Sequence, residues 1–310
     1  MQSKVFKNSK LNAKIPVILD TDIGTDIDDT WAIAMMLGCP ELDIRMILTS
    51  TGNTIYKAKI VAKLMETSGR TYIPIGIGLY TSDAIDGQGE WVKDYNLSQY
   101  PGVICDDGIS SMNDIIMSSE NEITIISIGP ATNIALAIER EPEIIKKCRY
   151  IGMQGSIRKG YFNSDSISDE YNVRADAASC RKVFEAPWNV TITPVDTCGL
   201  IKLEGEKYQK VLNCQKPIIK ALMENYRVWE NQCFPENKLS RYAKESTVLY
   251  DTVAIYLAFS EEMLDIEELV IKVTDDGYTI ITKNAPIIRC ATGWKDLNGF
   301  EKFLVDRLIK

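Results

Sequence analysis

Short apolar runs alternate with helical patterns over the first two thirds of the chain. A short apolar run bounded by turn residues is typical of a buried strand, and apolar positions spaced three and four apart indicate a helix. Expected strands are residues 15–20, 42–48, 73–77, 123–128, 149–153 and 190–195; expected helices are residues 31–37, 56–68, 112–118 and 175–184, and one ending at Glu139. This alternation predicts an α/β fold, with a mostly parallel central sheet and helices on both faces.

The last third of the chain is mainly helical. Helical patterns cover residues 200–234, 248–259 and 300–309, and apolar residues 269–273 and 278–282 predict a hairpin. Two long loops, residues 78–108 and 156–172, are expected to be either functional lids or surface excursions. We find no internal repeat or composition break, so we expect a single domain over residues 1–310, with a loose leader at 1–14 that lacks the apolar stretch of a secretion signal.

A cluster of aspartates follows the first expected strand. It consists of Asp20, Asp22, Asp26, Asp28 and Asp29. No lysine or arginine occurs between residues 15 and 44, so nothing close in sequence neutralises the cluster. Buried carboxylates that repel one another are costly, and a hard divalent cation with oxygen ligands relieves that cost. The cluster lies where a strand's carboxyl end meets a helix start, and ligands bind there in open α/β sheets.

Composition narrows the possible functions. The 310 residues carry a net charge of −8, which argues against nucleic acid or an anionic membrane as a partner but allows a small molecule. Eight cysteines without a CxxC pair indicate free thiols and a cytoplasmic location. The chain has no histidine, so acid–base work must fall to Asp, Glu, Tyr, Lys, Cys or water.

The acidic cluster has three further interpretations. Helix capping explains one or two of the aspartates, because Asp is a good N-cap, but not five beside a buried strand. An EF-hand loop is excluded, because Trp31 occupies the position of its bidentate glutamate. A Mg²⁺-dependent phosphotransferase with Asp20 as nucleophile remains open, although it leaves Asp28 and Asp29 without a role.

Six short motifs, in order along the chain, carry a more specific resemblance. They are Asp20-Thr-Asp-Ile-Gly-Thr-Asp-Ile-Asp-Asp29, Gly52-Asn53, Gly129-Pro-Ala-Thr-Asn-Ile-Ala135, Met153-Gln-Gly155, Glu170-Tyr-Asn172 with Asp176-Ala-Ala178, and Asp251-Thr-Val-Ala254. Each motif stands at an expected strand end or helix start. Together they resemble the inosine-uridine preferring nucleoside hydrolases over nearly the whole chain, and the resemblance implies a Rossmann-like core.

The resemblance implies a metal-dependent N-ribosyl hydrolase. Ca²⁺ would be held by Asp22, Asp29, Asp251 and the main-chain oxygen of Ile128, and Asp22 would also take the proton of the attacking water. The implied substrate-binding residues are Asp28, Asn53, Met153, Asn163, Glu170 and Asn172. Asp251 could instead simply cap the helix that begins there.

The residues expected to contact the base differ from those of many family members. Tyr250 stands where many relatives have a histidine that protonates the leaving base. Tyr226, Trp229 and Tyr250 are candidates for an aromatic wall against the base, as is Trp91, with core or surface packing as the alternative for each. The leading function is therefore Ca²⁺-dependent hydrolysis of ribonucleosides by a homodimer or homotetramer. The alternatives are a catalytically weakened nucleoside- or sugar-binding homologue and, less favoured, the phosphotransferase.

Overall fold

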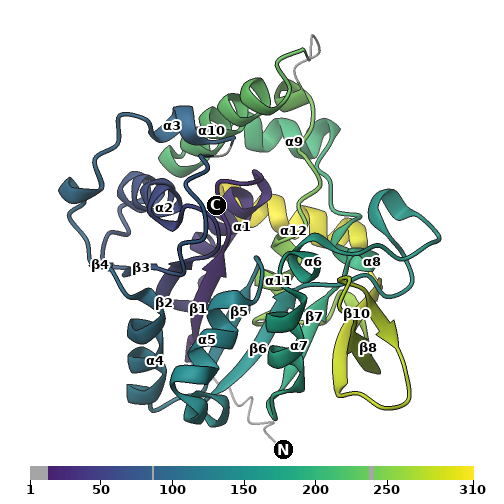
Figure 1. Cartoon of the computed structure of the whole chain (residues 1–310). Coiled ribbons are helices and arrows are strands. Elements are labelled where there is room, and N and C mark those ends of the chain that lie inside the picture. Colours follow the sequence, from purple (N-terminus) through teal and green to yellow (C-terminus); the bar gives the residue numbers. More distant parts are fainter. Residues whose placement is uncertain (1–12, 86, 237–240) are drawn as a thin grey trace, which may run out of the picture.

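The computed structural model describes residues 13–85, 87–236 and 241–310, so most of the expected leader lies outside the described residues. The strands are β1 (Ile15–Thr21), β2 (Leu42–Thr49), β3 (Ile75–Ile77), β4 (Ile104–Cys105), β5 (Ile123–Ser127), β6 (Cys148–Met153), β7 (Val190–Thr193), β8 (Leu264–Val273), β9 (Thr279–Ile281) and β10 (Ile287–Trp294). They form one ten-stranded sheet in the order β4-β3-β2-β1-β5-β6-β7-β10-β8-β9 (Figure 1). All pairs from β4 to β10 are parallel, whereas β8 pairs antiparallel with both β10 and β9.

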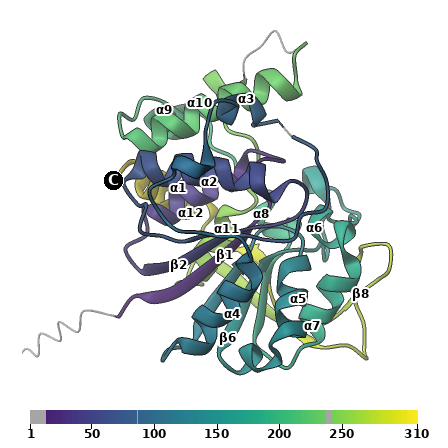
Figure 2. The ribbon, with the colours of Figure 1, turned by 60° about the vertical axis from the view of Figure 1, so that its left-hand side comes forward.

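Helices cover both faces of this sheet. They are α1 (Asp28–Leu37), α2 (Thr54–Ser68), α3 (Gly89–Val92), α4 (Gly108–Ser118), α5 (Thr132–Arg140), α6 (Tyr171–Ala175), α7 (Ala177–Glu185), α8 (Val195–Cys198), α9 (Gly205–Leu212), α10 (Pro217–Cys233), α11 (Thr252–Leu257) and α12 (Leu297–Ile309). Helices α4, α5 and α7 lie on one face, and α1, α2, α11 and α12 lie on the other (Figure 2). The predicted α/β architecture is confirmed.

Two apolar cores follow from the alternation of side chains along the strands. Val17 and Leu19 of β1 pack into one core, and Ile18 between them packs into the other. Successive side chains of a strand point to opposite faces, so a strand covered on both sides reads as a continuous apolar run. This is why the sequence of β1 predicts a buried strand rather than an alternating one.

Strand order places a ligand site at the end of β1. Its two neighbours are β2, the next strand in the sequence, and β5, which follows much later. Where the strand order reverses in this way, the connections that follow the neighbouring strands run to opposite sides of the sheet. A crevice therefore opens at the carboxyl ends of the strands. Asp22 follows β1 and Ile128 follows β5, and both lie at this edge.

The C-terminal part differs in detail from expectation. The predicted hairpin is present as β8 and β9, with Val273 opposite Thr279. The pattern over 248–259 predicts a longer helix than α11, and β10 has no counterpart among the expected strands. Within the described ranges, no helix combines the length and the apolar character that crossing a bilayer requires.

Candidate active site

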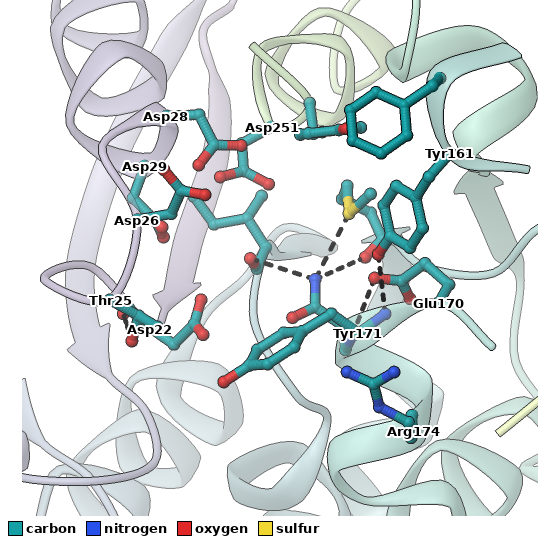
Figure 3. A pocket seen from close by; sticks show the side chains of 15 residues that line it. Asp22, Thr25, Asp26, Asp28, Asp29, Tyr161, Glu170, Tyr171, Arg174 and Asp251 are labelled. Atoms are coloured by element: carbon teal, nitrogen blue, oxygen red, sulfur yellow. Dashed lines mark hydrogen bonds between the residues drawn. The ribbon is translucent and has the colours of Figure 1, made fainter. Parts of the chain in front are cut away.

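A cleft of about 420 Å³ opens at the carboxyl ends of β1, β5 and β6. That volume is within the range of small-molecule sites. Its lining residues are Asp22, Thr25, Asp26, Asp28, Asp29, Ile128, Met153, Tyr161, Phe162, Glu170, Tyr171, Asn172, Arg174, Tyr250 and Asp251. Asp22, Asp26, Asp28 and Asp29 lie on one side of the cleft, and Tyr161 and Glu170 lie on the other (Figure 3).

Three buried carboxylates form the centre of the acidic side. One oxygen each of Asp28, Asp29 and Asp251 lies within 4.8 Å of the others. Burial, and then the charges of neighbouring aspartates, raise the pKa of all three carboxyls well above the ordinary value. Such a group of hard oxygen donors fits a divalent cation, which would replace mutual repulsion by attraction.

Helix capping does not account for this cluster. Helix α1 begins after Ile27, which makes no side-chain cap bond, and the side chain of Asp251 makes no cap bond to α11. The hydroxyl of Thr21 donates to the carboxylate of Asp29, and the side chains of Asp28 and Asp251 are hydrogen-bonded to each other. The structure therefore does not use Asp251 as the N-cap that its position before a helix allowed.

The Asp22 side chain lies at the edge of the same cleft, closely packed against Gly129. A Cβ atom on Gly129 would lie 2.9 Å from Asp22 Oδ1, so a residue with a side chain at 129 would displace the carboxylate. Asp22 is outside the three-carboxylate cluster, although the resemblance implies it as a ligand together with Asp29, Asp251 and Ile128. All four of these residues line the cleft.

Lys57 supplies a positive charge that the local sequence lacks. This lysine of α2 is only 1% exposed, and its Nζ donates to the main-chain oxygen of Asp22 at 2.7 Å and to Thr25 Oγ1 at 3.1 Å. Its charge lowers the pKa of Asp20 and Asp29, against the larger opposite effect of burial. Sequence reasoning missed it, because a lysine in a helical pattern is normally exposed.

Asp20 does not face the cleft. It is fully buried, and it accepts hydrogen bonds from Asn133 Nδ2 at 2.8 Å and Ser127 Oγ at 3.2 Å. Burial raises its pKa to about 7. An attacking nucleophile needs access to substrate, so this position does not support the phosphotransferase interpretation and matches a residue that orients the β1 and β5 ends.

Glu170 and Asn172 form the opposite wall at the start of α6. The Glu170 carboxylate accepts from the main-chain N–H groups of Gly155, Asn172 and Val173 at 2.8–3.1 Å, and burial raises its pKa to about 7. Asn172 Nδ2 donates to the main-chain oxygen atoms of Met153 at 3.0 Å and Ile128 at 3.4 Å. These bonds leave both side chains held at the cleft lining.

Loop 156–172 is tied down by a residue that sequence reasoning missed. The buried carboxylate of Asp196 accepts from the main-chain N–H groups of Ile157, Arg158 and Lys159 at 2.7–3.1 Å. Asp196 follows the strand expected at 190–195, so an aspartate at a strand's carboxyl end was a signal that could have identified it. The loop then delivers Tyr161, which contacts Tyr250 edge to face at 5.9 Å between ring centroids.

The structure does not bring four of the predicted substrate-binding residues to the cleft. Asn53 caps α2 by accepting from the Tyr56 N–H, and it lines a second pocket. Asn163 is exposed at the end of a 3₁₀ turn. Tyr226 and Trp229 are buried in the core, 6.1 Å apart between ring centroids. Trp91 is also buried, under the Nζ of Lys63. These three aromatic residues are packed in the core, whereas Tyr250 lines the cleft.

Comparison with known proteins agrees with this geometry. Residues 17–300 match the family described as inosine-uridine preferring nucleoside hydrolase. The non-specific ribonucleoside hydrolase RihC of Klebsiella pneumoniae is 28% identical over 226 residues, which cover 69% of this chain and 73% of that protein. A plant nucleoside hydrolase structure has a TM-score of 0.76 at 21% identity, over 96% of this chain and 99% of its own. The structure of a purine-preferring ribonucleoside hydrolase from Gardnerella vaginalis has a TM-score of 0.75 at 19% identity. The match covers 94% of this chain and 98% of that one.

Proposed function

Because the chain belongs to the inosine-uridine preferring nucleoside hydrolase family, it is a nucleoside hydrolase, and we propose that it uses Ca²⁺ to split ribonucleosides into ribose and a free base. The observation that carries the proposal is the buried group of Asp28, Asp29 and Asp251 in a cleft that also holds Glu170 and Asn172. It combines oxygen donors for a cation with polar groups for sugar hydroxyls in one small-molecule site.

The residues divide into roles on the two sides of the cleft. Asp22, Asp29, Asp251 and the Ile128 oxygen would hold the ion, and Asp28 would face the sugar. Bound Ca²⁺ would supply positive charge that orients the ribose diol and acidifies water. Glu170 and Asn172 would bind ribose hydroxyls.

Asp22 would act as the general base. Cleavage of an N-glycosidic bond passes through an oxocarbenium-like sugar, so a carboxylate-rich wall stabilises the positive charge that develops at the anomeric carbon. The Asp22 carboxylate would take one proton as the water oxygen bonds to that carbon. The bond to the base nitrogen would break at the same carbon, its electron pair would leave with the base, and the base would take up a proton from solvent to become the neutral free base.

The first test is release of reducing sugar from a panel of nucleosides, with and without EDTA. We expect release that stops on chelation and returns when Ca²⁺ is added. Asp22→Ala should lower kcat by about 10²- to 10⁴-fold, the usual contribution of a general base, while its melting temperature stays close to that of the unchanged protein. Asp43→Ala, at an exposed strand position paired with Arg45, is the matched control.

Two outcomes would contradict the proposal. Near-normal turnover by Asp22→Ala would exclude Asp22 as the base. Nucleoside binding without sugar release would favour the weakened binding homologue, which the tyrosine at position 250 leaves open. We also propose a homodimer or homotetramer of single-domain subunits, which light scattering after size exclusion would measure.

A further inference from the structure

The turn that carries the acidic cluster is held by side chains from other parts of the chain. Four main-chain oxygen atoms between Asp22 and Asp26 accept hydrogen bonds from Lys57, Tyr56, Trp229 and Gln88, in that order along the turn. Lys57 and Tyr56 belong to α2, Trp229 belongs to α10, and Gln88 comes from loop 78–108 just before α3. Three segments that are separate from the turn in sequence therefore fix the course of its main chain.

Gln88 binds this region on both sides of two cluster carboxylates. Its side-chain amide nitrogen donates to the main-chain oxygen of Asp26, and its amide oxygen accepts from Thr30 Oγ1 at 3.2 Å. Asp28 and Asp29 lie between these two contacts in sequence, and each supplies an oxygen to the three-carboxylate cluster. One side chain therefore binds the segment 26–30 at both of its ends.

The orientation of the Gln88 amide is fixed by its partners. A main-chain oxygen can only accept, so the amide nitrogen must face Asp26. The amide oxygen then meets two donors, Thr30 and Nδ2 of Asn225 in α10, the latter at 2.6 Å. The side chain is fully buried, where an amide that lost these partners would be costly. Gln88 therefore keeps its partners only while the segment 26–30 keeps its position.

The stretch around Gln88 is packed closely against α10 and α2. Gly87 lies so near α10 that a Cβ atom there would be 2.5 Å from Cys233 Sγ and 2.7 Å from Trp229 Cδ1. The main-chain N–H of Gln88 also donates to the Tyr56 hydroxyl at 3.1 Å, and that hydroxyl donates to Gly24. This part of loop 78–108 is therefore a fixed support of the acidic turn rather than a lid.

Helix α1 needs such a support, because no side chain caps its start. Its N-cap residue, Ile27, makes no side-chain cap bond. Its first two residues are Asp28 and Asp29, whose negative charges repel each other. A restraint from outside the helix therefore has to hold the two carboxylates in place.

We propose that Gln88 is a positioning residue for the bound ion: it holds residues 26–30 so that Asp29 reaches the ion beside Asp251. This inference rests on the proposed function, because the ion is part of it. Groups that orient metal ligands without touching the metal change its affinity by about 10- to 100-fold when they are removed. Gln88 would act in this way from loop 78–108, of which no described residue lines the cleft.

The test measures Ca²⁺ affinity by calorimetric titration of metal-free protein with Ca²⁺ alone. Gln88→Met keeps the side-chain length and loses three hydrogen bonds, so we expect Kd to rise by about 10- to 100-fold. Asn113→Leu is the matched control, because this buried amide donates to the main-chain oxygen of Ala137 on the other face of the sheet (Figure 2). Its Kd should stay within about twofold of the unchanged protein's.

Turnover separates ion affinity from folding. The Ca²⁺ concentration for half-maximal release of reducing sugar should rise in Gln88→Met by the same factor as Kd, and excess Ca²⁺ should restore most of kcat. A loss of stability alone would lower the melting temperature without changing that concentration. Thr30→Val removes one contact of Gln88 and should weaken Ca²⁺ binding, whereas Thr30→Ser keeps the hydroxyl and should restore it. Circular dichroism confirms that each variant is folded.

The outcomes distinguish this role from the proposed function. An unchanged Kd in folded Gln88→Met would overturn the positioning role and leave the nucleoside hydrolase function intact. If Gln88→Met does not fold, weaker Ca²⁺ binding by Thr30→Val than by Thr30→Ser would support the role, and equal binding would overturn it. Failure of the unchanged protein to bind Ca²⁺ would overturn the role together with the proposed ion.

Discussion

Lys57 Nζ donates a hydrogen bond of 2.7 Å to the main-chain oxygen of Asp22. The lysine comes from α2 and the aspartate from the turn after β1, so the bond joins two segments that are separate in sequence. It places a buried positive charge directly under the turn that carries the acidic cluster. Buried ammonium groups persist when hydrogen bonds and nearby negative charge compensate for lost water.

Lys57→Met should therefore make the metal-free protein less stable. The variant loses two charged hydrogen bonds and leaves the carboxylates without their internal cation, so we expect the unfolding free energy in EDTA to fall by about 1–3 kcal/mol. Added Ca²⁺ should raise the melting temperature more than in the unchanged protein, because the cluster is more negative. Lys59→Met, on the same helix and without a resolved ion pair, is the control for denaturant and thermal unfolding. Equal Ca²⁺ responses in the two variants would argue against a counter-charge role.

Removal of one carboxylate should abolish the response to metal. For Asp251→Asn, we expect the Ca²⁺-dependent rise in stability to disappear, whereas the unchanged protein should gain about 2.7 kcal/mol at a metal concentration of 100 times Kd. Calorimetric titration and thermal melting with and without EDTA measure this difference. Asp306→Asn, at an exposed position paired with Lys310, should keep the full response. A full response in Asp251→Asn would remove Asp251 from the ligand set.

Glu170 should make metal-free stability depend on pH. Its folded pKa is raised to about 7, above the ordinary value of 4.5, because it is buried. The folded state then binds the proton more tightly, so the contribution of Glu170 to stability is full below pH 4.5 and is lost as the pH rises to about 7. Urea unfolding in EDTA at several pH values should show this decline in the unchanged protein relative to Glu170→Gln. Parallel curves for the two proteins would contradict it.

A single methyl group at position 129 should impair catalysis more than stability. The Cβ atom of Gly129→Ala would lie 2.9 Å from Asp22 Oδ1, closer than real Cβ contacts, so the Asp22 carboxylate must move. Small displacements of catalytic groups cost large factors in rate. We expect kcat to fall by about tenfold or more, with circular dichroism unchanged. Unaltered kcat would show that Asp22 tolerates the shift.

Local sequence patterns predicted those strands and helices whose formation depends mainly on neighbouring residues. The apolar run of β1 and the helical spacing of α2 are visible in sequence because both are buried along most of their length. β10 was missed because its sequence, Ile287-Ile-Arg-Cys-Ala-Thr-Gly-Trp294, mixes a charge and a glycine into the apolar run. Its place between β7 and β8 is decided by tertiary pairing.

The candidate site was predictable to a similar extent. Asp28, Asp29 and Asp251 stand at helix starts. For each of them the sequence indicates a position at the edge of the sheet where the strands have their carboxyl ends. Lys57 and Tyr226 were not predictable, since their positions depend on which helix face meets which neighbour. Lysine is rarely buried, and a buried tyrosine has the same helical spacing as one that faces a ligand.

The carboxylate cluster joins two distant parts of the chain. Asp29 belongs to the first helix and Asp251 to the last third of the sequence, yet their oxygens lie within 4.8 Å. An ion bound between them would act as a removable cross-link that closes a very long loop, in the manner of a disulfide. A chain cut by a protease between these two residues should therefore stay together while the ion is bound and separate when it is chelated.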